Sequence, residues 1–327
     1  MRLTVAHETW PIAGSFRIAR GAKTEAHVVV AAIAGGGATG RGECVPYLRY
    51  GESVDSVMAQ IESVRGAIEA GVTRDALQSL LPPGAARNAL DCALLDREAK
   101  ASGRRAYDIL GLPPPQPVRT AYTLSLDEPQ SMARAASAAI GQGRTLLKLK
   151  IAGAGDLERV AAVRAAAPGA TLIADANEGW SAEDLPRLTP QLARLGVALL
   201  EQPLKAGADA ALADFQSPVP LCADESCHTR SDLDRIAGHY SHVNVKLDKA
   251  GGLTEALALA RAAKVGGLGL MIGCMVSTSL AMAPAMLLAG MADFVDLDGP
   301  LLLARDREPP IRYVGDRMMP PDPAIWG

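Results

Sequence analysis

The chain of 327 residues lacks the features that mark several classes of protein. Lysine and arginine form no run, and a net charge of −3 gives no basic surface, which argues against a nucleic-acid partner. The N-terminus lacks the long apolar core of a signal peptide, so we expect a cytoplasmic protein. No C-x-x-C pair occurs among the cysteines, which predicts reduced thiols, and the five histidines show no ligand spacing.

One stretch without charge, residues 266–292, is long enough to span a bilayer. It is interrupted by glycine, serine and threonine in GCMVSTS and by Pro284, so it predicts a buried strand, a turn and a buried helix, with no membrane contact. The expected partner is therefore a small molecule. The sequence leaves the oligomeric state open, and a homo-oligomer is compatible with it.

The first third of the chain has the pattern of an α+β domain. An apolar, β-branched run at residues 26–34, the turn GGGATG and the following RGECVP predict an antiparallel sheet. Apolar residues at helical spacing predict helices over residues 53–70 and 85–101. The proline cluster LPPPQP ends this part, so we assign the first domain to residues 1–115.

The remainder has the repeat of a parallel (β/α) barrel. Apolar runs that end in charge recur about every 22 to 28 residues, which is one strand, one crossover helix and two short loops. We expect an α/β fold with the barrel over residues 116–304 and a proline-containing tail, residues 305–327, that returns to the first domain. The predicted barrel strands are residues 118–125, 145–151, 171–175, 197–201, 219–224, 242–246, 268–272 and 293–297.

Ionisable residues stand at the C-terminal ends of these strands. They are Lys148, Lys150, Asp175, Glu201, Asp224, Lys246, Asp296 and Asp298. The carboxyl ends of barrel strands meet at one mouth, so residues far apart in the sequence are expected to share a site.

Asp175, Glu201 and Asp224 end three consecutive strands. A single acid in such a position is most often a helix N-cap. Three converging carboxylates, however, repel one another unless a cation lies between them. Oxygen ligands too few to fill a coordination shell suit Mg²⁺, which keeps positions for water or substrate. Asn177 and Glu225 stand beside two of the ligands and are expected to orient them.

The lysines are expected inside the barrel. Lys148 and Lys150 in LLKLK are two residues apart and share one face of their strand. A solvated outer face is the ordinary interpretation of such a pair, but the apolar flanking residues make the strand interior and leave the lumen for the lysines. Lys246 in HVNVKLD stands among apolar neighbours on the face shared with Asn244, which is also expected to orient a metal ligand. The second strand lies nearly opposite the sixth, so a substrate between them has an amine on each side.

This arrangement predicts proton transfer at a carbon next to a carboxylate. A metal that binds the carboxylate stabilises the enediolate formed when the neighbouring carbon loses its proton. A lysine with an ordinary pKa of about 10.4 is protonated at neutral pH. Burial beside Mg²⁺ and a second ammonium would lower that pKa by about three units, roughly 4 kcal/mol, into the range of a base. With a lysine on each face, the proton leaves one side and returns on the other, which inverts the carbon.

The motifs KxK, DxN, EQP, ADES and NVKLDKAGG follow one another in this order after the α+β domain. In this combination the chain resembles the enolase superfamily, in its muconate-lactonizing-enzyme-like branch. The resemblance implies a modified TIM barrel capped by the first domain, with Mg²⁺ bound by the three acids. It also implies that Lys150 and Lys246 are the two acid/base catalysts, and that Lys148 contacts the substrate carboxylate and helps to depress the pKa of Lys150.

Asp296 and Asp298 in DLDGP point to one face and call for a cation. A turn cap at Asp298 and a solvated Asp296 are the ordinary alternatives. This D-x-D, with RYGES, GAARNALDCAL, ADESCHTR and KLDKAGGLTEALALA, resembles the dipeptide epimerases, in particular those acting on L-Ala-D/L-Glu. The resemblance implies that the D-x-D pair holds the α-ammonium of an L-Ala-Glu dipeptide from murein peptide turnover, which is inverted at its C-terminal residue.

One position departs from that family pattern. Where these epimerases usually carry an arginine for the glutamate side chain, this chain has Lys23 in RGAKTEA. Lysine offers a positive point charge but not a bidentate fork, so an acidic substrate stays expected with a less secure preference for Glu. Arg20 is a nearby substitute, although an exposed arginine is equally compatible. Cys274 and Met275 end the seventh strand and are expected to line the pocket, because a lone thiol without a low-pKa environment is inert.

Two alternatives stay open. An o-succinylbenzoate synthase, N-acylamino acid racemase or cycloisomerase of the same superfamily would share the metal and the lysines but would have little use for two acids at the eighth strand. The turn AGAGDLE, with Asp175 about twenty residues beyond, has the outline of the dinucleotide-binding fingerprint of an NAD-dependent dehydrogenase. Glu158 replaces its third glycine, however, and Asp156 would face the pyrophosphate. A non-catalytic relative is disfavoured because every charged strand end is present.

Overall fold

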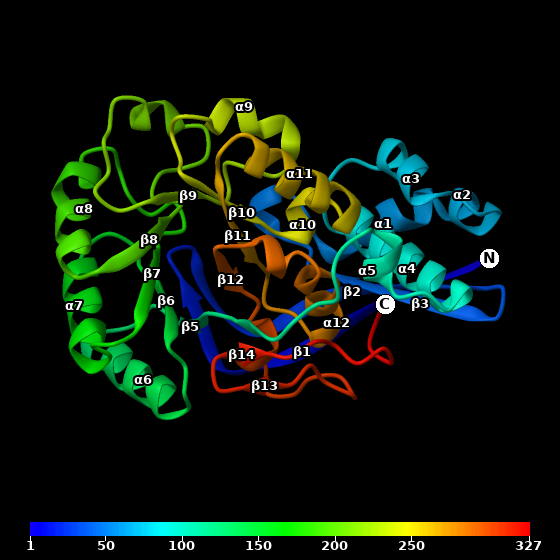
Figure 1. Cartoon of the computed structure of the whole chain (residues 1–327), viewed down its shortest axis with the longest axis horizontal. Coiled ribbons are helices and arrows are strands. Elements are labelled where there is room, and N and C mark those ends of the chain that lie inside the picture. Colours follow the sequence, from blue (N-terminus) through cyan, green and yellow to red (C-terminus); the bar gives the residue numbers. More distant parts are fainter.

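The computed structural model describes residues 1–327 as an N-terminal α+β domain beside an eight-stranded parallel barrel (Figure 1). The N-terminal sheet is antiparallel and has the order β1–β2–β3. The strands and helices of the N-terminal domain are β1 (Arg2–Ile18), β2 (Gly21–Gly35), β3 (Ala38–Cys44), α1 (Val54–Ser63), α2 (Arg65–Ala70), α3 (Arg74–Leu80), α4 (Ala85–Ser102) and α5 (Ala106–Ile109). The helix predicted over residues 53–70 is thus broken into α1 and α2.

Strand β3 packs directly on the backbone of α4. A Cβ atom at Gly40 or Gly42 would lie 2.1 Å from the carbonyl oxygen of Ala93 or Ala89, so only glycine allows this approach. The apolar residues of β2 pack with those of α1 and α4 in one buried cluster. The helix therefore has a fixed position against the sheet.

The predicted (β/α) barrel is confirmed. Its strands are β5 (Tyr122–Leu124), β6 (Leu146–Lys150), β7 (Thr171–Asp175), β8 (Val197–Glu201), β9 (Leu221–Ala223), β10 (His242–Val245), β11 (Gly269–Gly273) and β12 (Phe294–Asp296), each parallel to its sheet neighbours. The N–H of Ala121 donates to the carbonyl oxygen of Val295 at 2.8 Å and links the first and last strands.

The first predicted strand, residues 118–125, is wrong in its extent. Its first part forms β4 (Val118–Arg119), which leaves the barrel and pairs with β14 (Arg317–Met318). Together with β13 (Tyr313–Val314) these strands form a separate antiparallel sheet. The pairing partner lies almost 200 residues away in sequence, so no local pattern reports it.

Helices surround the barrel, with α6, α7 and α8 along one side (Figure 1). They are α6 (Pro129–Gly141), α7 (Asp156–Ala166), α8 (Asp184–Arg194), α9 (Leu233–Ile236), α10 (Leu247–Ala250), α11 (Leu253–Val265) and α12 (Ser279–Met286). Short 3-10 helices occupy Leu48–Tyr50, Asp209–Leu212, Arg230–Asp232, Ala289–Met291 and Gly299–Leu302. The charge-free stretch forms β11, a turn and α12, as predicted. None of the helices combines the length and the apolar character that crossing a membrane requires.

Alternation along the strands fills the barrel in layers. The lower layer is apolar and consists of Ala121, Leu146, Ile173, Leu199, Cys222 and Met271, with Phe294 at its edge. Two residues further along the same strand faces stand charged side chains, such as Lys148 above Leu146 and Asp175 above Ile173. The outward residues Leu147 and Leu149 belong to the large core between barrel and helices.

Two segments join the domains. The hairpin of β1 and β2, blue in Figure 1, reaches from the N-terminal domain to the barrel, where Arg17 exchanges hydrogen bonds with Ser125 and Leu126. The C-terminal residues run back to α4, where Trp326 donates from Nε1 to the carbonyl oxygen of Cys92 at 3.1 Å. The N–H of Gly327 donates to Asp96 Oδ1 at 2.7 Å.

Candidate active site

A cavity of about 610 Å³ lies where the hairpin meets the barrel mouth. The barrel contributes charged side chains from strands on all sides. The N-terminal domain contributes the hairpin tip and the loop before α1. Lining residues that matter below are Phe16, Arg20, Lys23, Lys148, Lys150, Asn177, Asp224, Glu225, Lys246, Cys274, Met275, Asp296 and Asp298.

Lys148 lies at the centre of the charged layer and is 1% exposed. Its Nζ lies 2.8 Å from Asp296 Oδ2, 2.7 Å from Glu201 Oε2 and 3.1 Å from Asp175 Oδ2. Burial lowers the pKa of Lys148, but these three carboxylates outweigh burial and raise that pKa well above its ordinary value. Lys148 is therefore a fixed positive charge.

Lys150 and Lys246 lie on opposite sides of the lumen, because β6 and β10 are four strands apart in the eight-stranded sheet. Lys150 Nζ donates to Asp175 Oδ2 at 2.6 Å, and Lys246 Nζ donates to Asp224 Oδ2 at 2.7 Å. Both side chains line the cavity. The Phe16 ring lies 5.9 Å from Lys150 Nζ and covers it from the hairpin side.

The charges of Lys246 and Asp224 stabilise each other. Burial lowers the pKa of Lys246, but Asp224 and Glu201 outweigh burial and raise it. Burial likewise raises the pKa of Asp224, whereas Lys246 and Lys249 bring it well below its ordinary value. The pKa of Lys246 is raised because carboxylates surround this ammonium, whereas the lowered lysine pKa expected from the sequence refers to a site that holds Mg²⁺.

Asp175, Glu201 and Asp224 stand at the ends of adjacent strands β7, β8 and β9, with Asp175 and Glu201 in register. Lysine ammonium groups lie between them, and no three acid, histidine or cysteine side chains surround a common point as in a formed metal centre. The donor chemistry nevertheless fits Mg²⁺. Glu201 Oε2 and Asp224 Oδ1 are buried and accept no hydrogen bond of good geometry, so each has a lone pair free for a hard cation.

The residues predicted to orient the acids lie beside them. Asn244 donates from Nδ2 to Glu201 Oε1 at 2.7 Å. Asn177 has a left-handed backbone (φ 44°), and its N–H donates to Asp175 Oδ1 at 2.9 Å. Its side-chain Oδ1 is buried without a partner at the cavity. Glu225 turns toward the hairpin, and burial together with Asp224 raises its pKa to about 7.

Arg20 and Lys23 on the hairpin have different surroundings. Arg20 is engaged by Glu178 at 3.1 Å and by Glu225 at 2.7 Å, and it donates to the carbonyl oxygen of Asn177. Lys23 is exposed at the cavity wall, with its Nζ 5.3 Å from the centre of the Tyr47 ring. Arg20 therefore fastens the hairpin to the barrel, and the ammonium of Lys23 is the one open to the cavity.

Asp296 and Asp298 end β12 at the cavity. Asp296 Oδ2 accepts from Lys148, while its Oδ1 is buried and unpaired. Asp298 Oδ2 accepts from the N–H of Thr123 at 2.6 Å, and burial with the neighbouring Asp296 raises the pKa of Asp298 to about 7. At the end of β11, burial raises the pKa of the Cys274 thiol well above its usual value, so this thiol is not a nucleophile.

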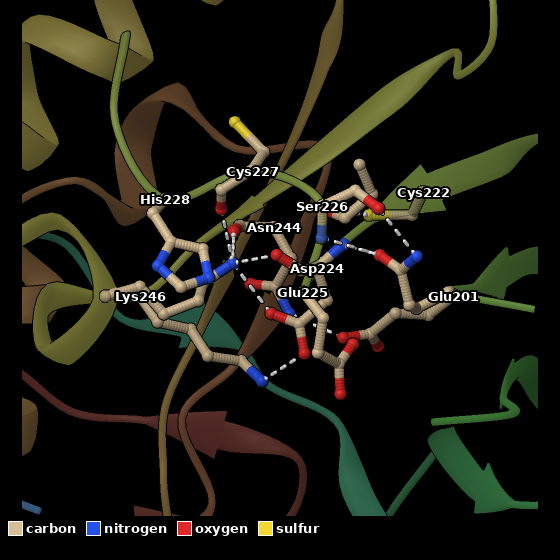
Figure 2. Close-up of polar contacts among 12 residues, drawn as sticks. Glu201, Cys222, Asp224, Glu225, Ser226, Cys227, His228, Asn244 and Lys246 are labelled. Carbon is tan, nitrogen blue, oxygen red and sulfur yellow. Dashed lines mark hydrogen bonds and ion pairs between the residues drawn. The ribbon is translucent and has the colours of Figure 1, made fainter. Parts of the chain in front are cut away.

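Two buried residues at the site escaped the sequence-based prediction. Lys249 lies in α10, contacts the Asp224 side chain and is 1% exposed. Gln202 follows β8 with a left-handed backbone (φ 36°) and accepts from the N–H of Asp224. Both residues occur in motifs noted above, KLDK and EQP. The motifs marked the two positions as part of the site, but they did not predict where the side chains point. Figure 2 shows Asp224, Glu225, Ser226 and Cys227 on the turn that Lys249 and Gln202 bind.

The turn after β6 does not form a dinucleotide site. Asp156 accepts hydrogen bonds from the N–H groups of Ala152 and Gly153 at 2.9 and 2.6 Å, and from Trp180 Nε1. The carboxylate thus occupies the donors that a pyrophosphate would need. The dehydrogenase alternative has no support in this geometry.

An eight-stranded parallel barrel with charged strand ends, closed by an α+β domain that contributes to the same cavity, defines a capped-barrel enzyme class. The family model for the mandelate racemase / muconate lactonizing enzyme N-terminal domain matches residues 1–111, and that for enolase C-terminal domain-like proteins matches residues 131–322. The chain therefore belongs to the mandelate racemase / muconate lactonizing enzyme family, which is part of the enolase superfamily.

Known proteins resemble the chain over nearly its whole length. It is 52% identical to an L-Ala-D/L-Glu epimerase of Escherichia coli (strain K12), over 94% of this chain and 96% of that protein. It is 45% identical to an N-acetyl-D-glutamate racemase of Pseudoalteromonas sp., over 92% and 95% of the two chains.

Solved structures agree with this relation. An enolase family member from Agrobacterium tumefaciens with homology to dipeptide epimerases, with bound sodium and L-Ala-L-Glu, has a TM-score of 0.96 at 51% identity and covers 99% of both chains. A dipeptide epimerase from Cytophaga hutchinsonii complexed with Mg and D-Ala-L-Val has a TM-score of 0.89 at 26% identity, over 98% and 94% of the two chains.

Proposed function

We propose that the chain is a Mg²⁺-dependent dipeptide epimerase that inverts the α-carbon of the C-terminal residue, with L-Ala-D/L-Glu as its substrate. The observation that carries the proposal is the placement of Lys150 and Lys246 on opposite sides of one lumen, with a carboxylate cluster between them. Inversion needs one group that takes a proton from one face and another that returns it on the opposite face.

Mg²⁺ would be held by Asp175, Glu201 and Asp224, whose oxygens suit it. When bound, the ion stabilises the negative charge that develops on a substrate carboxylate as the neighbouring carbon is deprotonated. Glu201 Oε2 and Asp224 Oδ1, which lie beside ammonium groups but accept no hydrogen bond of good geometry, support this assignment. Asn244 and Asn177 would keep the carboxylates oriented through their hydrogen bonds to Glu201 and Asp175.

The three lysines would have different roles, which follow from their positions. Lys148, a fixed cation with three carboxylate partners, would attract the substrate carboxylate into the lumen. Lys150 Nζ would hold or take the α-proton on one face, and Lys246 Nζ would do so on the other. Phe16 over Lys150 and the buried position of both amines exclude water from the reacting carbon.

The remaining residues would recognise the ends of the dipeptide. Asp296 and Asp298 form an acidic pair at the cavity whose only cation is Lys148, which Asp175 and Glu201 share, and the Oδ1 of Asp296 is buried and unpaired, so the pair suits the α-ammonium group. Lys23 would attract the glutamate side-chain carboxylate, because Arg20 is already engaged by Glu178 and Glu225. Cys274 and Met275 would form the apolar wall between these charges.

The relation to an N-acetyl-D-glutamate racemase makes N-acylglutamate racemisation the second candidate function. An N-acyl substrate keeps the α-carboxylate and the side-chain carboxylate but has no ammonium. It would therefore bring no cation to Asp296 and Asp298, which would keep only Lys148 as a counter-ion. The acidic pair favours the dipeptide.

Proton NMR in D₂O with Mg²⁺ tests the proposal. We expect the glutamate α-proton signal of L-Ala-L-Glu to disappear through exchange while the signals of the second diastereomer grow. N-acetyl-L-glutamate serves as the comparison and should react more slowly. Absence of exchange from the dipeptide, or faster reaction of the N-acyl compound, would contradict the assignment.

A further inference from the structure

Lys249 binds the main chain around Asp224 with all of its protons. Its Nζ donates to the carbonyl oxygens of Asp224 at 2.5 Å, Cys227 at 2.7 Å and Asn244 at 2.9 Å. The first two carbonyls belong to the turn after β9 and the third to β10, and Figure 2 shows these residues gathered around one point. One buried ammonium thus joins two neighbouring strand ends.

This arrangement leaves one oxygen of the Asp224 side chain, Oδ1, without a hydrogen bond of good geometry. An ammonium has three N–H donors, and the three carbonyls use all of them. Asp224 Oδ1 forms an ion pair with Lys249 Nζ at 2.8 Å but accepts no hydrogen bond of good geometry. Its lone pairs remain available to a second cation.

Gln202 holds the same turn from the side of β8. Its Oε1 accepts from the N–H groups of Asp224 at 2.8 Å and Ser226 at 3.1 Å. Its Nε2 donates to the carbonyl oxygen of Leu204 at 2.8 Å, and because a carbonyl oxygen only accepts, this contact fixes the amide orientation. The left-handed backbone of Gln202 (φ 36°) is a strained conformation of the kind that persists where the surrounding contacts determine it.

We propose that Lys249 and Gln202 are positioning residues that fix the Asp224 carboxylate for a divalent cation and leave its Oδ1 open to that ion. The inference rests on the proposed Mg²⁺ site. It differs from a purely structural role, in which loss of either side chain would lower stability without changing the affinity for the ion.

Mg²⁺ titration of the full-length protein by isothermal calorimetry separates these roles. Lys249→Met should bind Mg²⁺ about 10 to 100 times more weakly than the unmodified protein. Arg87→Met is the matched control, because Arg87 is also a buried cation that donates to main-chain carbonyls, those of Ala250 and Gly251, but it has no contact with Asp224. This control should lose stability and keep its Mg²⁺ affinity.

If Lys249→Met does not fold, Gln202→Met gives the same test, because it does not remove a buried charge. Gln202→Met should weaken Mg²⁺ binding about tenfold. Unchanged affinity in a folded positioning variant, or an equal loss in Arg87→Met, would overturn the proposal. A titration of the unmodified protein and of Asp224→Asn tests the metal site itself. No binding by the former, or equal binding by both, would overturn the proposed Mg²⁺ site and this inference with it.

Discussion

At the scale of single residues, the direction of a lysine side chain at the barrel mouth is predictable within a strand but not in the turn after it. Alternation along the strand predicts that Lys148 and Lys150 face the lumen, and they do, because Leu147 and Leu149 pack against the surrounding helices. The direction of Lys249 was not predictable in the same way. It follows the strand on a helical turn, where the period of two no longer applies.

The pKa of Asp298 gives the dipeptide reaction a specific pH dependence. Burial and Asp296 raise this pKa to about 7, and Lys148 is the cation that faces the pair. Below that pH the carboxyl becomes neutral and attracts the α-ammonium less. We expect the ratio of kcat/KM for L-Ala-L-Glu to that for N-acetyl-L-glutamate to fall as the pH drops from 8 to about 6. A ratio independent of pH would contradict the ammonium role of Asp298.

Lys23 should determine the preference for an acidic side chain. Lys23→Ala removes the open ammonium of the hairpin, so kcat/KM for L-Ala-L-Glu should fall about tenfold. The value for L-Ala-L-Met should not change, because that substrate has no second carboxylate. Lys23→Arg, which restores a bidentate donor, should retain activity on the glutamate dipeptide. Equal losses on both dipeptides would indicate that Lys23 supports the hairpin instead.

Secondary-structure elements follow local patterns except where distant contacts decide. The periodic runs of β6, β7 and α4 were predictable within a residue or two. The division of residues 118–125 between two sheets was not, because the partner of β4 comes from the tail. The direction of the Gln202 side chain is likewise set by the N–H groups of Asp224 and Ser226, which follow more than twenty residues later in the chain.

The contact of β3 with α4 should tolerate no side chain at Gly42. Gly42→Ala places a Cβ atom 2.1 Å from the carbonyl oxygen of Ala89, so the strand has to move and stability should fall by about 1–3 kcal/mol. Gly66→Ala in α2 is the control, since its Cβ meets nothing within 4 Å and alanine favours a helix by about 1 kcal/mol. Urea unfolding measures both variants. A neutral Gly42→Ala would show that the sheet and the helix are not held together by this packing.

At the scale of the whole molecule, the two domains share buried polar contacts. Asp248 of α10 accepts from the N–H of Val45 at 3.0 Å and from Asn88 Nδ2 at 2.9 Å in the N-terminal domain. The barrel could be predicted from its repeat, but this docking could not, since its partners are polar residues about 160 and 200 positions apart.

Asp248 should make stability depend on pH. Burial, with Glu52 and Glu43 nearby, raises its pKa to about 7, compared with about 3.9 in an unfolded chain. Between these values the folded protein binds a proton that the unfolded chain does not, so the free energy of unfolding falls as the pH rises. Asp248→Asn keeps the acceptor oxygen and does not titrate. Its stability relative to the unmodified protein should therefore improve from pH 5 to pH 8, on the order of 2 kcal/mol, in urea unfolding. A constant difference would contradict a buried, titrating Asp248.

The most direct test of the two-lysine account is α-proton exchange in D₂O by Lys150→Ala and Lys246→Ala, each supplied separately with L-Ala-L-Glu and L-Ala-D-Glu. The lysines lie on opposite sides of the lumen, so each variant should lose inversion, exchange the α-proton of only one epimer, and differ from the other variant in which epimer that is. Interconversion of the epimers by either variant would contradict the account.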